Sequence, residues 1–98
     1  MKYVDIREAD ERTKSEFWNL YESAFPANER RTSDLFAETL LSPEFCPMCV
    51  FDDAGEFCGL ICIWQFEKYV YGEHLATVPE KRNCGLGAKI FAETMEKV

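Results

Sequence analysis

The spacing of apolar residues changes along the chain from a strand period to a helical period. The short segment Lys2–Arg7 carries Tyr3, Val4 and Ile6, which predicts a first strand. Apolar residues then recur every three to four positions, so we expect a helix over about residues 14–25, with Thr13-Lys14-Ser15-Glu16 as its capping box. A shorter run of the same period predicts a second helix that begins with a cap at Ser33.

Three strand-like segments follow, at about residues 48–52, 57–66 and 69–78. The turn Asp53-Ala54-Gly55-Glu56 joins the first two into a hairpin, and Gly72 indicates a bulge in the third. A last helix opens at Gly85-Leu86-Gly87 with one apolar side, made of Leu86, Ile90, Phe91, Thr94 and Val98. This order predicts one domain over residues 1–98, of the α+β class, with an antiparallel sheet in this part of the fold.

The composition is that of a globular chain, with 47% apolar and 30% charged residues. A net charge of -7 repels nucleic acid and anionic membranes, so neither is expected as a partner. The chain has no apolar run of membrane-spanning length and no signal sequence at its start, which predicts a cytoplasmic protein. Acidic and basic residues balance after Phe57, so this second part can still accept an anionic ligand.

Five cysteines are many for 98 residues, and their odd number favours free thiols. The alternative is a zinc site, because four thiolates can complete a tetrahedral shell. Against zinc, Cys58 and Cys62 alternate with bulky apolar residues in a strand-like segment. Cys46 and Cys49, in contrast, have a loop context. The four residues concerned are Cys46, Cys49, Cys58 and Cys62.

The segment that carries chemistry is residues 75–87, where a strand turns through a loop with two glycines into a helix. Such a turn leaves backbone amides unpaired at the positive end of the helix dipole, where they bind phosphate oxygens. Gly85 and Gly87 let the main chain approach a ligand, while Arg82 and Lys89 add positive charge. Simple turn chemistry is the alternative explanation of the glycine pair.

Arg82-x-x-Gly85-x-Gly87 resembles the acyl-coenzyme A motif of the GNAT N-acetyltransferases. The predicted order of elements before it is also similar to that family, and Asp5-Ile6-Arg7-Glu8-Ala9 resembles the family's first strand. Two further segments resemble a bacterial subgroup, Ala24-Phe25-Pro26-x-x-Glu29-Arg30-Arg31 and Glu73-His74-Leu75-Ala76. The resemblance covers essentially the whole chain and implies a mixed sheet flanked by helices.

The resemblance further implies that the chain binds acetyl-coenzyme A and transfers the acetyl group to a primary amine, with no metal. Loop amides would hold the pyrophosphate, and the strand before the loop would pair with pantetheine. The loop residues are Arg82, Asn83, Cys84, Gly85, Leu86 and Gly87, and the strand residues are Ala76, Thr77 and Val78. A backbone amide near Thr77 suits polarisation of the thioester carbonyl.

Glu73 is the candidate proton acceptor that the resemblance implies, and its alternative role is to orient a neighbour or the amine. Strand alternation places Glu73 on one face with Tyr71, Leu75 and Thr77, where partial burial would raise its pKa. The same alternation places His74 on the opposite face, as a structural residue. Glu29, Arg30 and Arg31 would line the acceptor site, with a solvated charged loop as the alternative. The aromatic residues of the helices, together with Trp64 and Phe66, are expected in the core or lining a groove.

The resemblance also leads us to expect a further strand, a helix and a final hairpin, none of which the 98 residues contain. The strand over residues 69–78 would then have a free edge and only half of the pantetheine slot. We therefore expect either a homodimer that covers this edge or a monomer of low stability. An acetyltransferase of this length would be active only if another chain supplies the missing elements. A non-catalytic coenzyme A binding or interaction module is the alternative.

Overall fold

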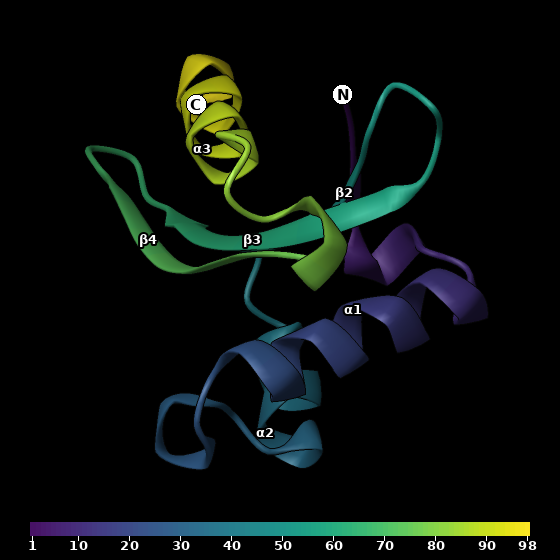
Figure 1. Ribbon diagram of the computed structural model, residues 1–98. Coiled ribbons are helices and arrows are strands. Elements are labelled where there is room, and N and C mark those ends of the chain that lie inside the picture. The colour runs from purple at the N-terminus through teal and green to yellow at the C-terminus, as the bar shows by residue number, and fades with distance from the viewer.

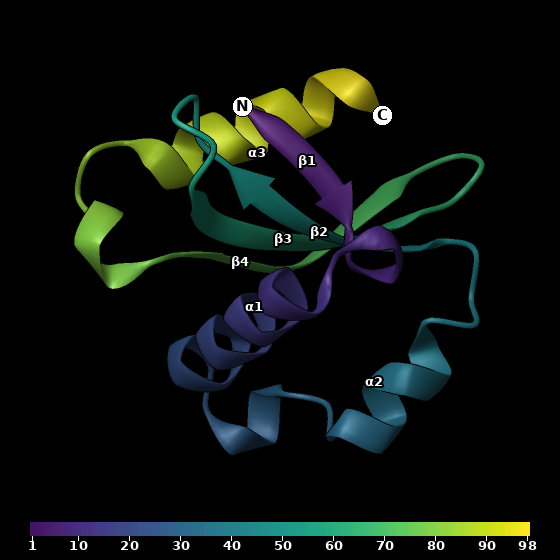
Figure 2. The ribbon, with the colours of Figure 1, turned by 90° about the vertical axis from the view of Figure 1, so that its right-hand side faces the viewer.

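The computed structural model describes all 98 residues, as four strands and three α-helices. The strands are β1 (Lys2–Asp5), β2 (Phe45–Phe51), β3 (Phe57–Gln65) and β4 (Val70–Thr77). They form one antiparallel sheet in the order β1-β2-β3-β4. Helices α1 (Glu11–Ala24) and α2 (Ser33–Thr39) lie on one face of this sheet, and α3 (Leu86–Lys97) lies on the other (Figures 1 and 2). The expected α+β architecture is therefore present.

The two helix caps differ from those that the sequence pattern predicts. Asp10 caps α1, because its Oδ1 accepts the backbone N–H of Thr13 at 2.8 Å, so the helix begins three residues before residue 14. Thr32 caps α2 in place of Ser33, and its Oγ1 accepts the N–H of Leu35 at 3.2 Å. Asp caps as well as Ser does and Thr caps only somewhat less well, so the residue that takes the extended backbone conformation at the boundary becomes the cap.

Strand β2 begins at Phe45, earlier than the predicted residue 48, and it includes Pro47. A proline has no N–H for a sheet ladder, so it is tolerated only where one neighbour is missing. Strand β1 pairs with β2 only from Met48 to Phe51, which leaves the β1 side of Pro47 without a partner strand. The segment around Cys46 and Cys49 is consequently strand and not loop.

The core has two layers because β3 is buried on both faces over most of its length. On the α1 side, aromatic rings dominate, among them Phe17, Tyr21, Phe36 and Phe45. On the α3 side, a smaller cluster packs around one residue of α3, Ile90, with Val50, Cys58, Ile61 and Ile63. Burial on both faces explains why β3 reads as a continuous apolar run.

These layers contradict the zinc alternative. Cys49 and Cys62 belong to the core on the α1 side, whereas Cys46 and Cys58 pack on the α3 side, so the sheet separates the two pairs. No group of three or more histidine, cysteine or acidic side chains is placed to hold a metal ion. Burial raises the pKa of Cys49 to about 12 and raises that of Cys62 further, which keeps both thiols protonated.

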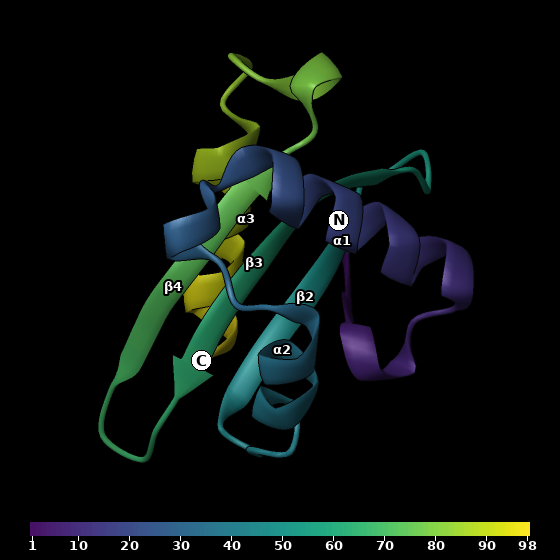
Figure 3. The same cartoon turned by 90° about the horizontal axis from the view of Figure 1, so that it is seen from below.

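Strand β4 is an edge strand with a neighbour on one side only (Figure 3). The bulge expected at Gly72 is present. Gly72 faces Ile63 and His74 faces Cys62, so Glu73 is the extra residue without a partner on β3. The bulge decides which way the next side chains point, and the candidate site depends on it.

No helix of the structure combines the length and apolar character that crossing a bilayer requires.

Candidate functional site

The connection from β4 to α3 exposes a run of free backbone amides. After β4 the chain makes a short 3-10 turn, Pro79–Lys81, and then adopts the left-handed backbone conformation at Asn83 (φ 64°) and at Gly85 (φ 79°). The N–H groups of residues 83–88 donate to no acceptor within the protein. They lie at the positive end of the 12-residue helix α3. These free donors at a helix start have the geometry that anion binding requires, as the glycine spacing predicts.

Side chains in this loop are held in fixed positions. The Nε–H of Arg82 donates to the carbonyl of Thr77 at 3.1 Å, and the thiol of Cys84 donates to the carbonyl of Lys81 at 2.8 Å. The Lys81 ammonium pairs with Asp52 at 2.6 Å, which raises the pKa of that ammonium. The charge of Lys81 is therefore balanced within the protein, while Arg82 remains exposed beside the free amides.

The end of β4 offers its own backbone groups at the free edge. The N–H of Val78 donates to the carbonyl of Cys58 at 2.9 Å, so it points toward β3 and is not free for a ligand. Because an antiparallel strand alternates, Thr77 turns its N–H and C=O away from β3, and that carbonyl receives Arg82. Ala76 is buried against the α1 side. Of the three predicted pantetheine residues, Thr77 is thus the one that offers its N–H to the open edge.

Glu73 lies at the centre of a polar cluster on the α1 side. Two N–H groups of Arg31 bind its carboxylate, one of them at 2.7 Å from Oε1, and the indole N–H of Trp64 donates to Oε1 at 3.1 Å. Burial by itself raises the pKa of Glu73, but the hydrogen bonds from Arg31 and Trp64 and the charge of Arg31 outweigh it. The net result is a pKa below the usual value, opposite to the direction expected from the sequence, so the carboxylate is ionised.

His74 lies on the same side of the sheet as Glu73, which corrects the alternation argument. Its ring contacts those of Tyr21 and Phe25, with centroids 5.2 Å and 4.4 Å apart. The Nε2–H donates to the carbonyl of Glu29 at 2.9 Å, while the buried Nδ1 lies 3.3 Å from Glu73 without the alignment of a hydrogen bond. The bulge at Glu73 breaks the period of two, so adjacent side chains turn the same way.

The loop between α1 and α2 brings its predicted acceptor residues to different places. Only Arg31 reaches Glu73, and its backbone N–H donates to the hydroxyl of Tyr21 at 2.9 Å. Arg30 turns back, donating to the carbonyl of Phe25 at 2.8 Å. The side chain of Glu29 is exposed. Arg31 and Glu73 are 42 residues apart, and no local pattern in the sequence pointed to their pairing.

Beside this cluster is an aromatic hollow that sequence reasoning did not find as a unit. Its volume is about 370 Å³, and its lining residues are Arg31, Trp64, Phe66, Tyr69 and Tyr71. Trp64 and Phe66 were expected only as core or groove lining, and the two tyrosines were assigned no role. The signal available in the sequence was the density of aromatic residues on both sides of the Glu67-Lys68 turn.

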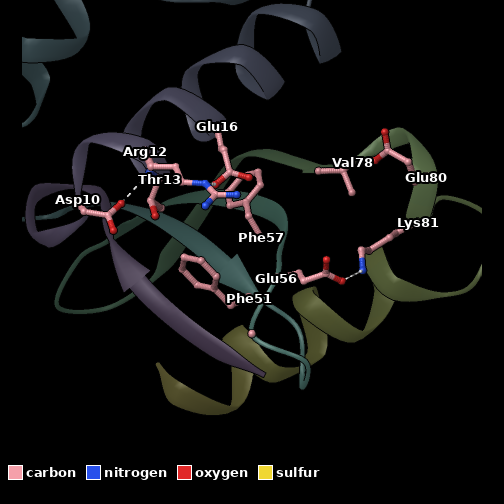
Figure 4. A pocket seen from close by; sticks show the side chains of 11 residues that line it. Asp10, Arg12, Thr13, Glu16, Phe51, Glu56, Phe57, Val78, Glu80 and Lys81 are labelled. Carbon is pink, nitrogen blue, oxygen red and sulfur yellow. Dashed lines mark hydrogen bonds and ion pairs between the residues drawn. The ribbon is translucent and has the colours of Figure 1, made fainter.

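The largest hollow, of about 630 Å³, is elsewhere, between the start of α1, the β2–β3 turn and the segment after β4 (Figure 4). Four carboxylates line it against two basic groups, Arg12 and Lys81. An acidic lining of this kind repels phosphate. The hollow contains neither Glu73 nor the glycines of the loop, so its size alone does not mark it as the site.

The antiparallel sheet, with its open edge strand leading into an amide-lined helix start, has the α+β arrangement that the resemblance to the GNAT family implies. Residues 10–98 match the family model "Acetyltransferase (GNAT) family". The chain belongs to this family, and the fold resemblance drawn from its sequence is confirmed.

The structure is similar to a solved protein of Bacteroides thetaiotaomicron assigned as an acetyltransferase of the GNAT family. The TM-score is 0.87 at 27% sequence identity, and the match covers 100% of this chain and 56% of the other. The chain therefore spans little more than half the length of that neighbour. No curated protein matches the sequence.

Proposed function

We propose that this chain binds acetyl-coenzyme A and forms the coenzyme side of a site that acetylates a primary amine. The observation that carries the proposal is the run of free amides over residues 83–88 at the start of α3. Their donors fit a pyrophosphate, and Arg82 lies beside them to add charge. Membership of the GNAT family supports acyl transfer as the reaction class.

In the proposed reaction the amine nitrogen attacks the thioester carbon, a C–N bond forms, and the C–S bond breaks. The ammonium gives up one proton to solvent before attack, and the nitrogen loses a second proton as the amide forms, which the departing thiolate takes up. The N–H of Thr77, which faces the open edge of β4, is the group that we propose stabilises the developing negative charge on the carbonyl oxygen.

For Glu73, the contacts support the orienting role over that of proton acceptor. A carboxylate has about four lone-pair positions, and Arg31 and Trp64 occupy three of them. Its lowered pKa makes it a weak base. We propose that Glu73 holds Arg31 and Trp64 in place, so that the acceptor side of the site keeps its shape.

The exchange Gly87→Glu is expected to separate coenzyme binding from stability. A Cβ at residue 87 meets no atom within 4 Å, and a carboxylate in the first turn of a helix interacts favourably with its dipole, so the folded protein accepts the change. The added negative charge stands among the free amides and should weaken acetyl-coenzyme A binding at least about tenfold, equivalent to about 1.4 kcal/mol. Calorimetric titration and thermal unfolding measure the two effects.

Gly72→Glu is the matched control, because this glycine also has open space around its Cβ position and lies outside the loop. Acetyl-pantetheine, which lacks the pyrophosphate, should bind the wild type and Gly87→Glu equally. Unchanged acetyl-coenzyme A affinity in Gly87→Glu would contradict the phosphate loop. Binding without turnover of any amine would favour the non-catalytic coenzyme A module.

The homodimer remains a prediction. Beside the free edge of β4 lie two exposed apolar side chains, Leu75 and Phe91, which a second copy would cover. Analytical ultracentrifugation should give twice the mass of one chain, and Leu75→Lys should reduce the dimer fraction. A single species with the mass of one chain at every concentration would refute the dimer.

A further inference from the structure

A small apolar hollow lies between α1, α2 and the turn after β1, on the face of the sheet that these two helices cover (Figure 2). Its volume is about 300 Å³, at the lower end of the ordinary range for small-molecule sites. The ring of Trp18 stands nearly perpendicular to that of Phe36, with centroids 5.5 Å apart and planes 83° apart. The other apolar walls are Ile6, Ala37 and Leu40. These walls suit a ligand with a compact apolar body, above all an aromatic ring.

The polar groups of this hollow favour a ligand of negative charge. No carboxylate belongs to its lining, although the chain as a whole has a net charge of -7. The charged residues of the lining are Arg7 and Lys14, and Ser33 adds a hydroxyl group. The indole N–H of Trp18 donates to no group of the protein and is open to solvent. Donors and positive charge without a competing carboxylate are the lining that an anion requires.

The two basic groups are not equally available to a ligand. The guanidinium of Arg7 donates to two backbone carbonyls, each at 3.0 Å, and pairs with Asp5 at 2.7 Å, so it is used within the protein. Lys14 pairs only with Glu11, at 3.6 Å, and the side chain of Glu11 is 94% exposed. An exposed pair of this kind is weak, so the ammonium of Lys14 is free to bind a ligand.

We propose that this hollow binds a small arylcarboxylate, with its aromatic ring against Trp18 and Phe36 and its carboxylate paired with Lys14. The ring makes edge-to-face and offset contacts, and the carboxylate accepts charge-assisted hydrogen bonds from the ammonium. The hollow shares no residue with the cluster around Glu73 or with the free amides of residues 83–88. The site is therefore separate from the proposed coenzyme site and does not depend on acetyl transfer.

The indole N–H resonances of the protein provide a direct test. The chain has two tryptophans, of which Trp18 lines this hollow and Trp64 lies elsewhere. Titration with phenylacetate, without coenzyme, should shift the indole resonance of Trp18 saturably in a ¹H–¹⁵N spectrum and leave that of Trp64 unchanged. The variant Trp18→Phe assigns the two resonances. Phenylacetamide and 2-phenylethylamine, which carry the same ring without the carboxylate, should each bind at least about fivefold more weakly.

The variant Lys14→Met removes the ammonium and keeps most of the side-chain length, so phenylacetate should bind about fivefold more weakly. Lys68→Met is the matched control, because it changes the net charge equally at an exposed lysine outside the hollow, and it should bind as the wild type does. Ala37→Glu places a carboxylate in the lining at an exposed position of α2 and should abolish the shift of Trp18. Thermal unfolding checks that each variant is folded.

Equal binding of phenylacetate and phenylacetamide would overturn the proposal, as would the absence of a saturable shift of Trp18. Unchanged phenylacetate binding in Lys14→Met would do the same. A shift of Trp18 that grows with protein concentration in the absence of ligand would show that a second copy of the chain occupies the hollow, and this result too would overturn the proposal.

Discussion

Replacing Arg31 by leucine is expected to lower the free energy of unfolding by about 3 kcal/mol, because it leaves the Glu73 carboxylate without its main partner. Both side chains are largely shielded, with exposed fractions of 20% and 16%. Arg31 also lies over the rings of Phe45 and Trp64, at 5.3 Å and 5.9 Å from their centroids, and these contacts are lost as well. Urea unfolding at pH 7 measures the change.

The matched control is Arg12→Leu. Arg12 is 89% exposed and its nearest carboxylate oxygen, on Glu16, is 3.8 Å away. An exposed pair of this kind contributes little, so the expected change in stability is within about 0.5 kcal/mol. If Arg31→Leu were no more destabilising than Arg12→Leu, the cluster around Glu73 would not hold the α1–α2 loop to the sheet.

The pH dependence of stability tests the same cluster through Glu73. The folded-state pKa of this carboxyl group is lowered from its usual value of 4.5, so its contribution to stability is fully present above that value. The contribution is lost as the pH falls through the folded-state pKa. The variant Glu73→Gln should therefore be less stable than the wild type at pH 7, and the difference should shrink as the pH falls below about 4.5. A difference independent of pH would show that the charge of Glu73 contributes nothing.

Gly59→Ala is expected to destabilise the protein by about 3 kcal/mol or more. A Cβ at this position of β3 would lie 2.6 Å from the carbonyl oxygen of Ala76 and 3.1 Å from Cδ1 of Ile90. The first atom belongs to the backbone of β4, so the clash is relieved only if β4 moves away from β3 or α3 moves away from the sheet. Either movement displaces Thr77 relative to the amides of the loop, and coenzyme binding should weaken together with stability.

Thermal and urea unfolding of Gly59→Ala should be compared with those of Gly72→Ala. Gly72 is in the neighbouring strand, and a Cβ there meets no atom within 4 Å. The Gly72 variant should change stability by less than about 0.5 kcal/mol. Equal stability of the two variants would mean that β3 and β4 do not approach as closely at Gly59 as the structure shows.

Much of the fold was predictable because its signals are local. The helical period of α1 and α3, the apolar run of β3 and the turn at residues 53–56 each depend on neighbours within a few positions. The turn with free amides before α3 was predictable for the same reason, since Gly85 directly precedes the helix and Gly87 lies in its first turn. Helix starts were displaced by one to three residues, because several adjacent residues were able to cap and the sequence does not rank them.

The cluster around Glu73 was less predictable. The sequence by itself determined the order of the elements, the glycine-bearing turn before α3 and the family to which the chain belongs. Only the tertiary structure decided that Glu73 is the bulged residue of β4, that it turns to the same side as His74, and that Arg31 reaches it from the α1–α2 loop. The first physical reason is that a single extra residue reverses the alternation of a strand. The second is that the lowered pKa of Glu73 depends on hydrogen-bond donors that are distant in sequence, Trp64 at 9 positions and Arg31 at 42 positions.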